Sequence, residues 1–304
     1  MTRRPLRAAT AALACVLVAS ACSGEEPAPT SEEAFDRAQS KHLATVTDKD
    51  LDAALFHVSN DVDNKWLPLR PGTQFVYEGG VTEDGERLSH RVIFTVTDLT
   101  KVINGVHSIV LWDRDYTDGH LVEAELAYFA QDNDGNVWNM GEYPEEYDEG
   151  TFEGAPDTWL AGLSGAQAGI MMRANPQAGT PGYFQGLVPA IEFADRAKIF
   201  KMGEKTCVPV DCYDDVLVTD EWDPSEAGAH QLKYYAPGVG NVRVGWAGAK
   251  EKEKETLALA KLVELSPEAL AAARAEAEKL EARAYEVQND LFRHTLPAQR
   301  LEAQ

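Results

Sequence analysis

The sequence predicts a mainly β protein, an antiparallel meander that forms a curved sheet or half-barrel, with short N-terminal helices and one C-terminal helix. Turn dipeptides recur at 84–85, 104–105, 118–119 and 134–135, each an Asp-Gly or Asn-Gly pair, and such pairs favour two-residue hairpin turns. The segments between them are rich in β-branched and aromatic residues with alternating polarity. An Ala-rich segment with helical spacing follows residue 266.

Residues 1–21 have the composition of a secretion signal. Arginines at positions 3, 4 and 7 precede a short apolar stretch that is too short for a membrane helix and has the length of a signal core. The stretch ends in ASAC at 19–22, which resembles a bacterial lipobox. We expect Cys22 to be lipidated, with diacylglycerol and palmitate as the membrane anchor. The alternative is an ordinary signal sequence, cleaved after Ala21, in which Cys22 has no role.

Residues 22–54 are expected to be an acidic linker that leads into short helices. The segment SGEEPAPTSEE at 23–33 is rich in Pro, Ser and Glu and poor in apolar residues, a composition typical of extended linkers. Apolar residues three to four positions apart in residues 34–60 predict one or two short helices.

Residues 55–265 are expected to form one antiparallel β domain. A turn with two prolines and a glycine precedes residue 73, after which the four turn dipeptides divide the chain into hairpins. Residues 145–200 are rich in Gly and Pro, so we expect a long excursion with brief strands over one edge or face of the sheet. A second set of strands is expected at about 190–206, 213–222, 230–235, 240–246 and 256–265.

The cysteines Cys207 and Cys212 are separated by four residues that include Pro209. Proline disfavours a helix here and suggests a tight bend between two strands. An even pair of cysteines in an exported protein favours a disulfide. A soft metal site is the alternative, although the spacing does not match the usual zinc pattern and no histidine lies nearby in the sequence.

Residues 266–304 are expected to form a C-terminal helix and tail. Ser266 is a favourable N-cap, Pro267 suits the first helical position, and Glu268 places an acid in the first turn. We expect the helix to reach about residue 292 and the last dozen residues to fray. Ala273, Ala277, Leu280, Ala284, Val287 and Leu291 have heptad-like spacing and form a seam that either packs on the chain's own domain or supports weak self-association through residues 266–291.

Composition narrows the classes of function. The 304 residues include 28 Lys plus Arg and 50 Asp plus Glu, a formal charge of −22. This acidic excess argues against a nucleic-acid partner, because nucleic-acid binding needs a basic surface. No catalytic residue and no cofactor are expected, because the sequence has no serine elbow, phosphate-binding loop, dinucleotide fingerprint or zinc-protease pair of histidines.

No metal ligands are expected either. The segment DNDGN at 132–136 resembles part of a calcium loop, but two of the ligand positions of such a loop are missing, and a hairpin tip explains the segment. Acidic clusters elsewhere, including Asp113 with Asp115 and Asp118, leave two interpretations open. They either converge on a hard cation or form a solvated acidic surface.

Aromatic residues supply the best candidates for a binding site. Many of them fall in or beside expected strands, and one face of a curved sheet that carries such residues can bind an apolar ligand. The alternative is that they form the core of the domain. The candidate ligand-binding residues are Trp112, Tyr128, Trp138, Trp222 and Tyr235.

Four segments, LPLRPGTQFVYEG, TVTDLTKVINGV, FAQDNDGNVWNMGE and KYYAPGVGNVRV, occur in this order within about residues 60–265. As a set they resemble a family of secreted bacterial lipoproteins of unassigned function. The resemblance implies an envelope location and a β-rich domain, and it supplies no catalytic residues. The KEKEKE loop at 250–255 and the helical tail look peculiar to this chain.

Together these features predict a lipoprotein that is anchored in the cell envelope and faces its extracytoplasmic side. Its β domain is expected to be a non-enzymatic binding module for a small apolar or amphipathic ligand. The alternative is a structural or interaction lipoprotein that acts through its acidic surface or its C-terminal helix. An empty, aromatic-lined concavity favours the first function, and a filled core with concentration-dependent association favours the second.

Overall fold

The computed structural model describes residues 51–57 and 59–301. The expected signal sequence, Cys22 and most of the expected linker lie outside the described residues. Where short helices were expected, the described part of the chain has one 3₁₀ turn, η1 (Ala53–Leu55), whose first turn is capped by the Asp52 carboxylate. The rest of that expectation falls on residues that are not described.

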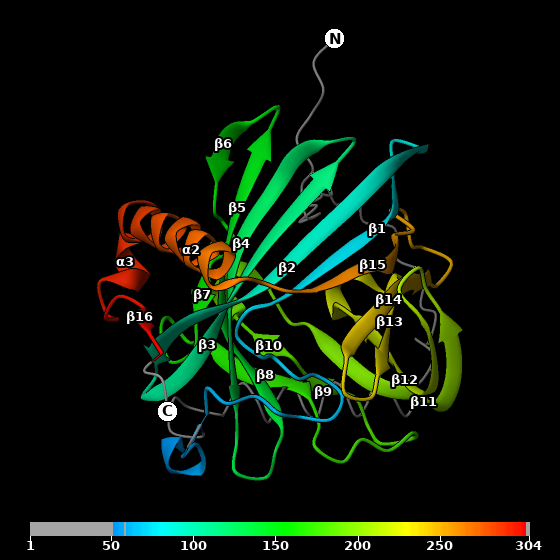
Figure 1. Ribbon diagram of the computed structural model, residues 1–304, viewed down its shortest axis with the longest axis horizontal. Helices are drawn as coiled ribbons and strands as arrows, with labels where there is room; N and C mark the ends of the chain where they lie inside the picture. Colours follow the sequence, from blue (N-terminus) through cyan, green and yellow to red (C-terminus); the bar gives the residue numbers. More distant parts are fainter. Residues whose placement is uncertain (1–50, 58, 302–304) are drawn as a thin grey trace, which may run out of the picture. The chain divides into compact units, whose positions relative to one another are not determined.

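The first half of the domain is a five-stranded antiparallel meander (Figure 1). Each strand pairs with the next along the chain. The first three turns lie where the dipeptides predict them. At each of these turns both central residues have a positive φ, as at Asp84 (48°) and Gly85 (83°), the geometry that matches the twist of paired strands. The strands are β1 (Thr73–Glu83), β2 (Glu86–Ile103), β3 (Val106–Thr117), β4 (His120–Gln131) and β5 (Val137–Asp148).

The second half is another antiparallel meander, and its strands lie close to the expected ranges. Its last strand pairs with β1, so both meanders belong to one sheet. A 3₁₀ turn, η3 (Pro224–Glu226), lies in one of its connections. The strands are β11 (Arg196–Cys207), β12 (Cys212–Trp222), β13 (His230–Ala236), β14 (Gly240–Ala247) and β15 (Thr256–Glu264).

The tight bend between β11 and β12 is closed by a disulfide. Cys207 and Cys212 face each other at the end of the hairpin, and their sulfur atoms are bonded. The predicted disulfide is therefore present.

The excursion between the two meanders consists of short elements that extend both edges of the sheet. Three of its strands pair with β5, one pairs with β11, and another adds a further edge beyond β8. The elements are β6 (Thr151–Gly154), β7 (Trp159–Leu160), β8 (Gln167–Met172), β9 (Tyr183–Phe184), β10 (Gly186–Leu187) and η2 (Pro189–Ile191).

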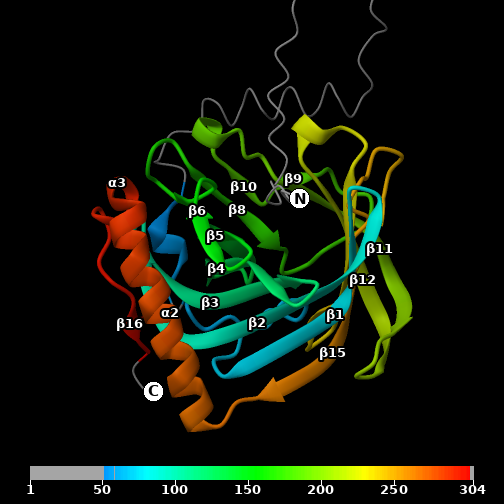
Figure 2. The same ribbon diagram turned by 90° about the horizontal axis from the view of Figure 1, so that it is seen from above.

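The sheet of residues 52–301 curves until its two edges almost meet (Figure 2). Its order runs from β10 and β8 through the two meanders to β11 and β9. The two edge strands β9 and β10 are separated by Gln185 alone, so one short segment belongs to both edges. The fold class predicted from the sequence, a curved antiparallel sheet close to a half-barrel, is confirmed.

The C-terminal helix α2 (Pro267–Val287) lies against the convex face of the sheet (Figure 2). The Ser266 hydroxyl accepts a hydrogen bond from the Ala269 N–H, as expected of an N-cap. Ala273, Ala277, Leu280 and Ala284 of the expected seam are buried, whereas Val287 is exposed, and the helix contacts β2 and β4. The seam therefore packs on the chain's own domain, whereas self-association stays a prediction.

Two expectations about the C-terminus were wrong. The helix does not continue to residue 292, because α2 ends at Val287 and a separate short helix, α3 (Asn289–Phe292), follows it. The described part of the tail is also ordered rather than frayed. Its strand β16 (Gln299–Arg300) pairs with β2, where the backbone of the tail gains hydrogen bonds that a frayed end would leave to water.

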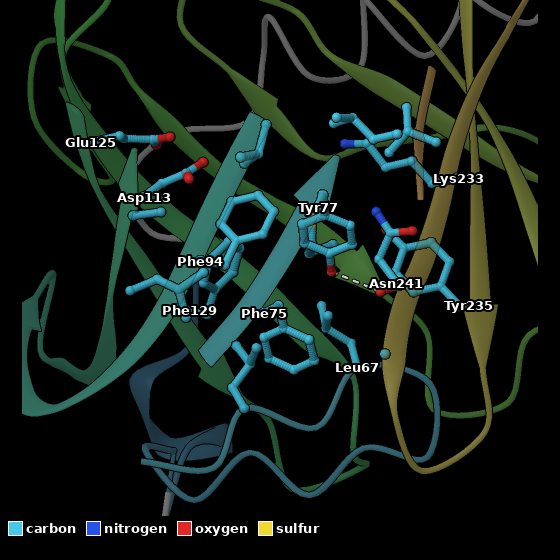
Figure 3. Close-up of a pocket in the computed structure, with 18 of the residues that line it drawn as sticks. Leu67, Phe75, Tyr77, Phe94, Asp113, Glu125, Phe129, Lys233, Tyr235 and Asn241 are labelled. Carbon is cyan, nitrogen blue, oxygen red and sulfur yellow. Dashed lines mark hydrogen bonds between the residues drawn. The ribbon is translucent and has the colours of Figure 1, made fainter. Parts of the chain in front are cut away.

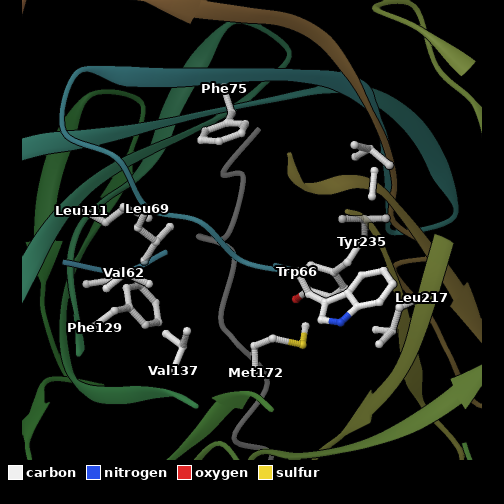
Figure 4. Close-up of a cluster of buried hydrophobic side chains, with 14 of the residues drawn as sticks. Val62, Trp66, Leu69, Phe75, Leu111, Phe129, Val137, Met172, Leu217 and Tyr235 are labelled. Carbon is white, nitrogen blue, oxygen red and sulfur yellow. The ribbon is translucent and has the colours of Figure 1, made fainter. Parts of the chain in front are cut away.

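Apolar side chains from all parts of the sheet meet on its concave side (Figure 4). The segment before β1 crosses this interior and contributes Val62, Trp66 and Leu69 to the cluster. An isolated backbone bridge between Val62 and Leu69 holds the segment in a compact loop. Within the described residues, no helix has both the length and the apolarity needed to cross a membrane.

Candidate ligand-binding cavity

A cavity of about 300 Å³ lies inside the curve of the sheet. Its walls come from strands of both meanders, and the loop at residues 67–69 lines one end. Pockets that bind small molecules are concave, largely apolar and begin at about this size. Figure 3 shows that the side chains around the cavity are sorted, with apolar residues at one end and charged residues at the other.

The apolar end of the cavity is lined by aromatic and aliphatic side chains. Phe75 and Tyr77 come from β1, Phe94 from β2 and Phe129 from β4, and Leu67 lies beside Phe75 (Figure 3). The ring of Tyr77 packs edge-on against that of Phe94, with centroids 5.6 Å apart. The Tyr77 hydroxyl donates a hydrogen bond of 2.7 Å to the Asn241 carbonyl oxygen, so its polar tip is satisfied and the ring stays buried.

Carboxylates gather at the opposite end of the cavity, which we call the acidic end. It is formed by the cavity-lining residues Asp113, Asp115, Glu125, Glu142 and Glu255. Asp113, Asp115 and Glu125 share the concave face because alternate residues of a strand point to the same side of the sheet. Along this face of β3 and β4, the side chains change from apolar at one end to acidic at the other. On β3 the inward order is Leu111, Asp113, Asp115, all of which line the cavity.

Like charges lie directly opposite each other on the two strands that carry most of the acidic end. Asp113 pairs with Glu125 and Asp115 pairs with Glu123 in the antiparallel register of β3 and β4. Two carboxylates in such positions repel each other and destabilise a sheet. This arrangement is unfavourable for an empty protein, so it calls for protonation or for a bound group that offsets the charge.

Burial shifts the titration of these carboxyl groups toward the neutral form. It raises the pKa of Asp115 to about 7 and that of Glu123 to about 8. Burial, together with neighbouring carboxylates, also holds the pKa of Asp113 and that of Glu125 well above the ordinary range. Near neutral pH the acidic end therefore holds a mixture of charged and protonated carboxyl groups, which accept and donate hydrogen bonds.

Two basic side chains face the acidic end, and both already have acidic partners. Lys233 from β13 lies 2.9 Å from the Glu221 carboxylate. His90 from β2 lies 3.1 Å from Glu255 and 3.8 Å from Asp115. Burial lowers the pKa of His90, but the hydrogen bond with Glu255 and the nearby negative charges outweigh burial and raise the pKa overall. Lys233 also attracts Glu125 and Glu142, but the carboxylates that line the cavity still outnumber the basic groups beside them.

Of the five aromatic residues predicted to bind a ligand, Tyr235 lines this cavity. The other four lie elsewhere. Trp112 is on β3 next to inward-facing Leu111, and the guanidinium of Arg114 covers its ring at 3.8 Å. Tyr128 is fully buried. Because it alternates with the cavity-lining residues of β4 and lies near Glu281 and Tyr285 of α2, it faces the helix.

Trp138 and Trp222 also lie outside the cavity lining. Trp138 packs edge-on against Phe56 and donates its indole N–H to Asp132. Trp222 lies beside His230 and the cationic groups of Arg196 and Lys198. Trp138 and Trp222 therefore make structural contacts outside the cavity. The structure does not bring the five aromatic residues into one site.

The segment at 132–136 is a hairpin tip, as the sequence indicates. The Asp132 carboxylate accepts hydrogen bonds from the N–H groups of Asp134 and Asn136 and from the Trp138 indole. Its oxygens are therefore occupied within the turn itself. Across the residues that the structure describes, no group of three or more His, Cys, Asp or Glu side chains is arranged to hold a metal ion.

Sequence reasoning missed the acidic end, although it noted Asp113 and Asp115. The sequence feature that points to this cluster is a repeated spacing of acids, Asp-x-Asp at 113–115 and Glu-x-Glu at 123–125. The two pairs lie on strands that one hairpin joins. Glu255 was also missed, because it belongs to a loop of alternating charge that was interpreted as solvated. In the structure Glu255 lines the cavity and accepts a hydrogen bond from Gln231.

Comparisons with known proteins leave the function open. No protein-family model matches the chain, and no curated protein matches it significantly. One solved structure that is similar is a protein from Bacteroides fragilis NCTC 9343, provisionally described as exported and as having a YmcC-like fold. It has 12% identity and a TM-score of 0.38, over 66% of this chain and 99% of that one.

A second is a protein from Parabacteroides distasonis ATCC 8503, provisionally described as a lipoprotein. It has 12% identity and a TM-score of 0.35, over 66% of this chain and 100% of that one. Both similarities are too distant to transfer a fold or a function to this chain.

Proposed function

We propose that this protein is a lipoprotein of the bacterial cell envelope, anchored through Cys22, whose β domain is a non-enzymatic binding module for a small amphipathic ligand. The observation that carries the proposal is the cavity of about 300 Å³ with an aromatic end and an acidic end. Protein interiors normally pack without voids much larger than a water molecule. A core that served stability alone would not place five carboxylates around such a space.

The two ends of the cavity define the shape of the ligand in chemical terms. The apolar part of a ligand gains free energy by leaving water among Phe75, Phe94 and Phe129. Its polar part meets side chains that both donate and accept hydrogen bonds. A molecule with one apolar and one polar end therefore fits the cavity in a single orientation.

The envelope location is supported by the sequence and by one feature of the fold. The ASAC segment at 19–22 has the pattern of a lipoprotein signal, followed by a linker rich in Pro, Ser and Glu. The disulfide between Cys207 and Cys212 suits a protein that folds outside the cytoplasm, because reducing conditions inside the cell disfavour such bonds.

Native mass spectrometry tests the binding function. The chain from Ser23 to Gln304, secreted and purified without detergent, would be compared with its denatured mass. We expect an added mass of a few hundred daltons that disappears on denaturation. A bare monomer that also takes up no added amphiphile would refute the binding module. A bare dimer would favour the alternative, an interaction lipoprotein that associates through residues 266–291.

Fractionation of cells tests the anchor separately. We expect the wild-type chain in the membrane fraction and a lipid-modified N-terminal peptide in its digest. The Cys22→Ser variant should lose the lipid mass. An unmodified Cys22 in the wild-type protein would refute the anchor while leaving the binding proposal intact.

A further inference from the structure

We propose that the ligand carries a positively charged head that donates hydrogen bonds, such as a protonated amine, and that this head binds between Asp113 and Glu125. The proposal deepens the proposed function and rests on it. The apolar part of the ligand then lies toward Phe75 and the loop at 67–69. The cavity would thus select cationic amphiphiles over neutral or anionic molecules of the same length.

The Asp113 side chain is the central observation. The residue is 6% exposed and lines the cavity. Its carboxylate accepts a hydrogen bond of 2.6 Å from the N–H of the adjacent Arg114. Among the described residues, no side chain forms a hydrogen bond or an ion pair with it. The Arg114 guanidinium attracts Asp113 but, within the described residues, forms no ion pair with it. A buried carboxylate without an ion-pair partner is unfavourable, and the open space in front of Asp113 is the cavity itself.

The neighbouring carboxylates point to the same requirement. Asp115 has one buried oxygen, Oδ1, that makes no hydrogen bond in the described structure. Glu125 lies directly across the strand pair from Asp113, and Figure 3 shows both side chains at the same end of the cavity. One ammonium group placed between two opposed carboxylates would hydrogen-bond to both and replace their repulsion with attraction.

Acidic side chains outnumber basic ones around this position. Positive charge there comes from Lys233 and His90, each already paired with a glutamate, and from the Arg114 guanidinium, which is attracted to Asp113. An anionic head would therefore meet repulsion, and a neutral head would gain hydrogen bonds without charge attraction. The titratable groups that belong to this end or interact electrostatically with it are Tyr77, His90, Asp113, Arg114, Asp115, Glu123, Glu125, Glu142, Glu146, Asp157, Asp195, Glu221, Lys233 and Glu255.

Binding of a cation should also depend on pH. A cation binds best when the carboxyl groups are ionised, so it competes with the protons that burial favours. Between pH 6 and pH 8.5 the affinity for a primary amine should therefore rise as Asp113, Glu125 and the neighbouring carboxyl groups Asp115 and Glu123 lose their protons. The affinity for a neutral alcohol of the same length should change little over this range.

The test compares three probes of equal chain length: octylammonium, octanol and octanoate. Isothermal titration at pH 8.5 would use the chain from Ser23 onward, which keeps every residue that the structure describes. We expect octylammonium to bind at least about tenfold more tightly than the other two, as expected for hydrogen bonds to charged groups. Asp113→Asn and Glu125→Gln should each remove most of this preference and leave octanol binding unchanged.

The matched control is Glu278→Gln, which neutralises an exposed acid on α2 far from the cavity lining. It should bind all three probes like the wild type. Thermal unfolding of each variant checks that it is folded, and the two cavity variants serve as independent tests.

Each remaining outcome has a distinct meaning. Octanol or octanoate binding as tightly as octylammonium would overturn the cationic head and leave the proposed function standing. If no probe binds up to millimolar concentration, the proposed function fails and the inference fails with it. Calcium binding that Asp113→Asn abolishes, without any amine preference, would replace the amine with a metal ion and overturn the inference.

Discussion

The Nζ atom of Lys101 on β2 lies 2.8 Å from Oε1 of Glu281 on α2, although the two residues are 180 positions apart in the chain. Both side chains are almost fully buried, at 0% and 7% exposure. The same ammonium donates hydrogen bonds to the Leu296 carbonyl and the Tyr285 hydroxyl. One buried lysine thus joins the sheet, the helix and the tail after α3.

Replacement of this lysine should destabilise the protein strongly. Lys101→Met leaves the Glu281 carboxylate buried without its ammonium partner, so we expect the free energy of unfolding to fall by about 3–5 kcal/mol. Urea denaturation measures the change. The double variant with Glu281→Leu should be less destabilised than the sum of the two single variants, because it leaves no unpaired buried charge.

An exposed pair in the same helix provides the control. Lys279 and Glu276 lie 2.6 Å apart, with both side chains more than half exposed. Lys279→Met should change stability by less than about 1 kcal/mol, since exposed ion pairs contribute little. A small loss for Lys101→Met, similar to this control, would contradict the structural role assigned to the buried pair.

The acidic end should make the empty protein less stable at high pH. Burial raises the pKa of Asp115 to about 7 and the pKa values of Glu123 and Asp195 to about 8, well above unfolded carboxyl values. Between the unfolded and folded pKa values the native state holds more protons, so stability is greatest at low pH and is lost as pH rises through 7 to 8. Urea denaturation at pH 5.5, 7 and 8.5 should show this decline.

The same measurement on Asp113→Asn separates the acidic end from other titrating groups. This variant removes one carboxylate from the opposed pair with Glu125, so it should be more stable than wild type at pH 8.5 and show a shallower decline. A wild-type profile that is flat, or that rises with pH, would show that these carboxyl groups are not held in their neutral form.

The close packing of the two edges of the sheet should depend on the absence of a side chain at Gly169. A Cβ on Gly169 of β8 would lie 2.4 Å from the Gln185 carbonyl carbon and 2.5 Å from the Phe184 oxygen. Gly169→Ala should therefore separate the edges and lower the melting temperature by several degrees. Gly245→Ala on β14 is the control, because its nearest neighbour would be a Tyr234 ring atom at 4.0 Å. Equal melting temperatures for both variants would contradict this packing.

Filling the cavity should block the ligand. Ala127 lines the cavity between the positions of Glu125 and Phe129 on β4. Ala127→Leu adds three carbon atoms to that space and should abolish the ligand mass in native spectra. Its stability should be little changed, because the new side chain enters open volume. Ala127→Ser changes polarity with little change in size and should retain the ligand. Retention of the ligand by the leucine variant would place the binding site elsewhere.

Much of the fold could be predicted because local turn chemistry is strong. Asp-Gly and Asn-Gly pairs define the first three hairpins, and positive φ at both turn residues is found where they predict it. Ser266 and Pro267 likewise mark the start of α2. The β16 pairing could not be predicted, because it depends on β2, which lies almost two hundred positions away. The end of α2 was also missed, and there the side chain of Gln288 hydrogen-bonds to the distant Ala155 carbonyl.

The acidic end of the candidate site could not be derived from the sequence, because a bulge decides which residues share a face. A regular two-residue turn at 118–119 would set Asp113 opposite Ala124. The register shifts between Asp115 and Tyr116, which instead places Asp113 opposite Glu125. The extra residue thus brings four carboxylates of two strands to the concave side. Nothing in the local sequence announces this bulge.

The aromatic candidates failed to converge for a related reason. Strands β3 and β4 are buried on both faces, one inside the curve and one beneath α2 or surface side chains. Both faces of these strands carry apolar residues, so the sequence pattern does not distinguish the cavity face from the outer face. Alternation places Tyr128 and Phe129 on opposite faces, but it does not say which of the two faces the cavity.

The helix on the convex face separates the residues that stabilise the sheet from those that line the cavity. Because α2 packs against β2 and β4 from outside, those strands draw stability from a surface that does not line the cavity. Selection can therefore act on the two faces separately. Asp113 and Glu125 could therefore be exchanged, and the chemistry of the cavity changed, while Lys101 and Glu281 keep the helix on the sheet and preserve the architecture.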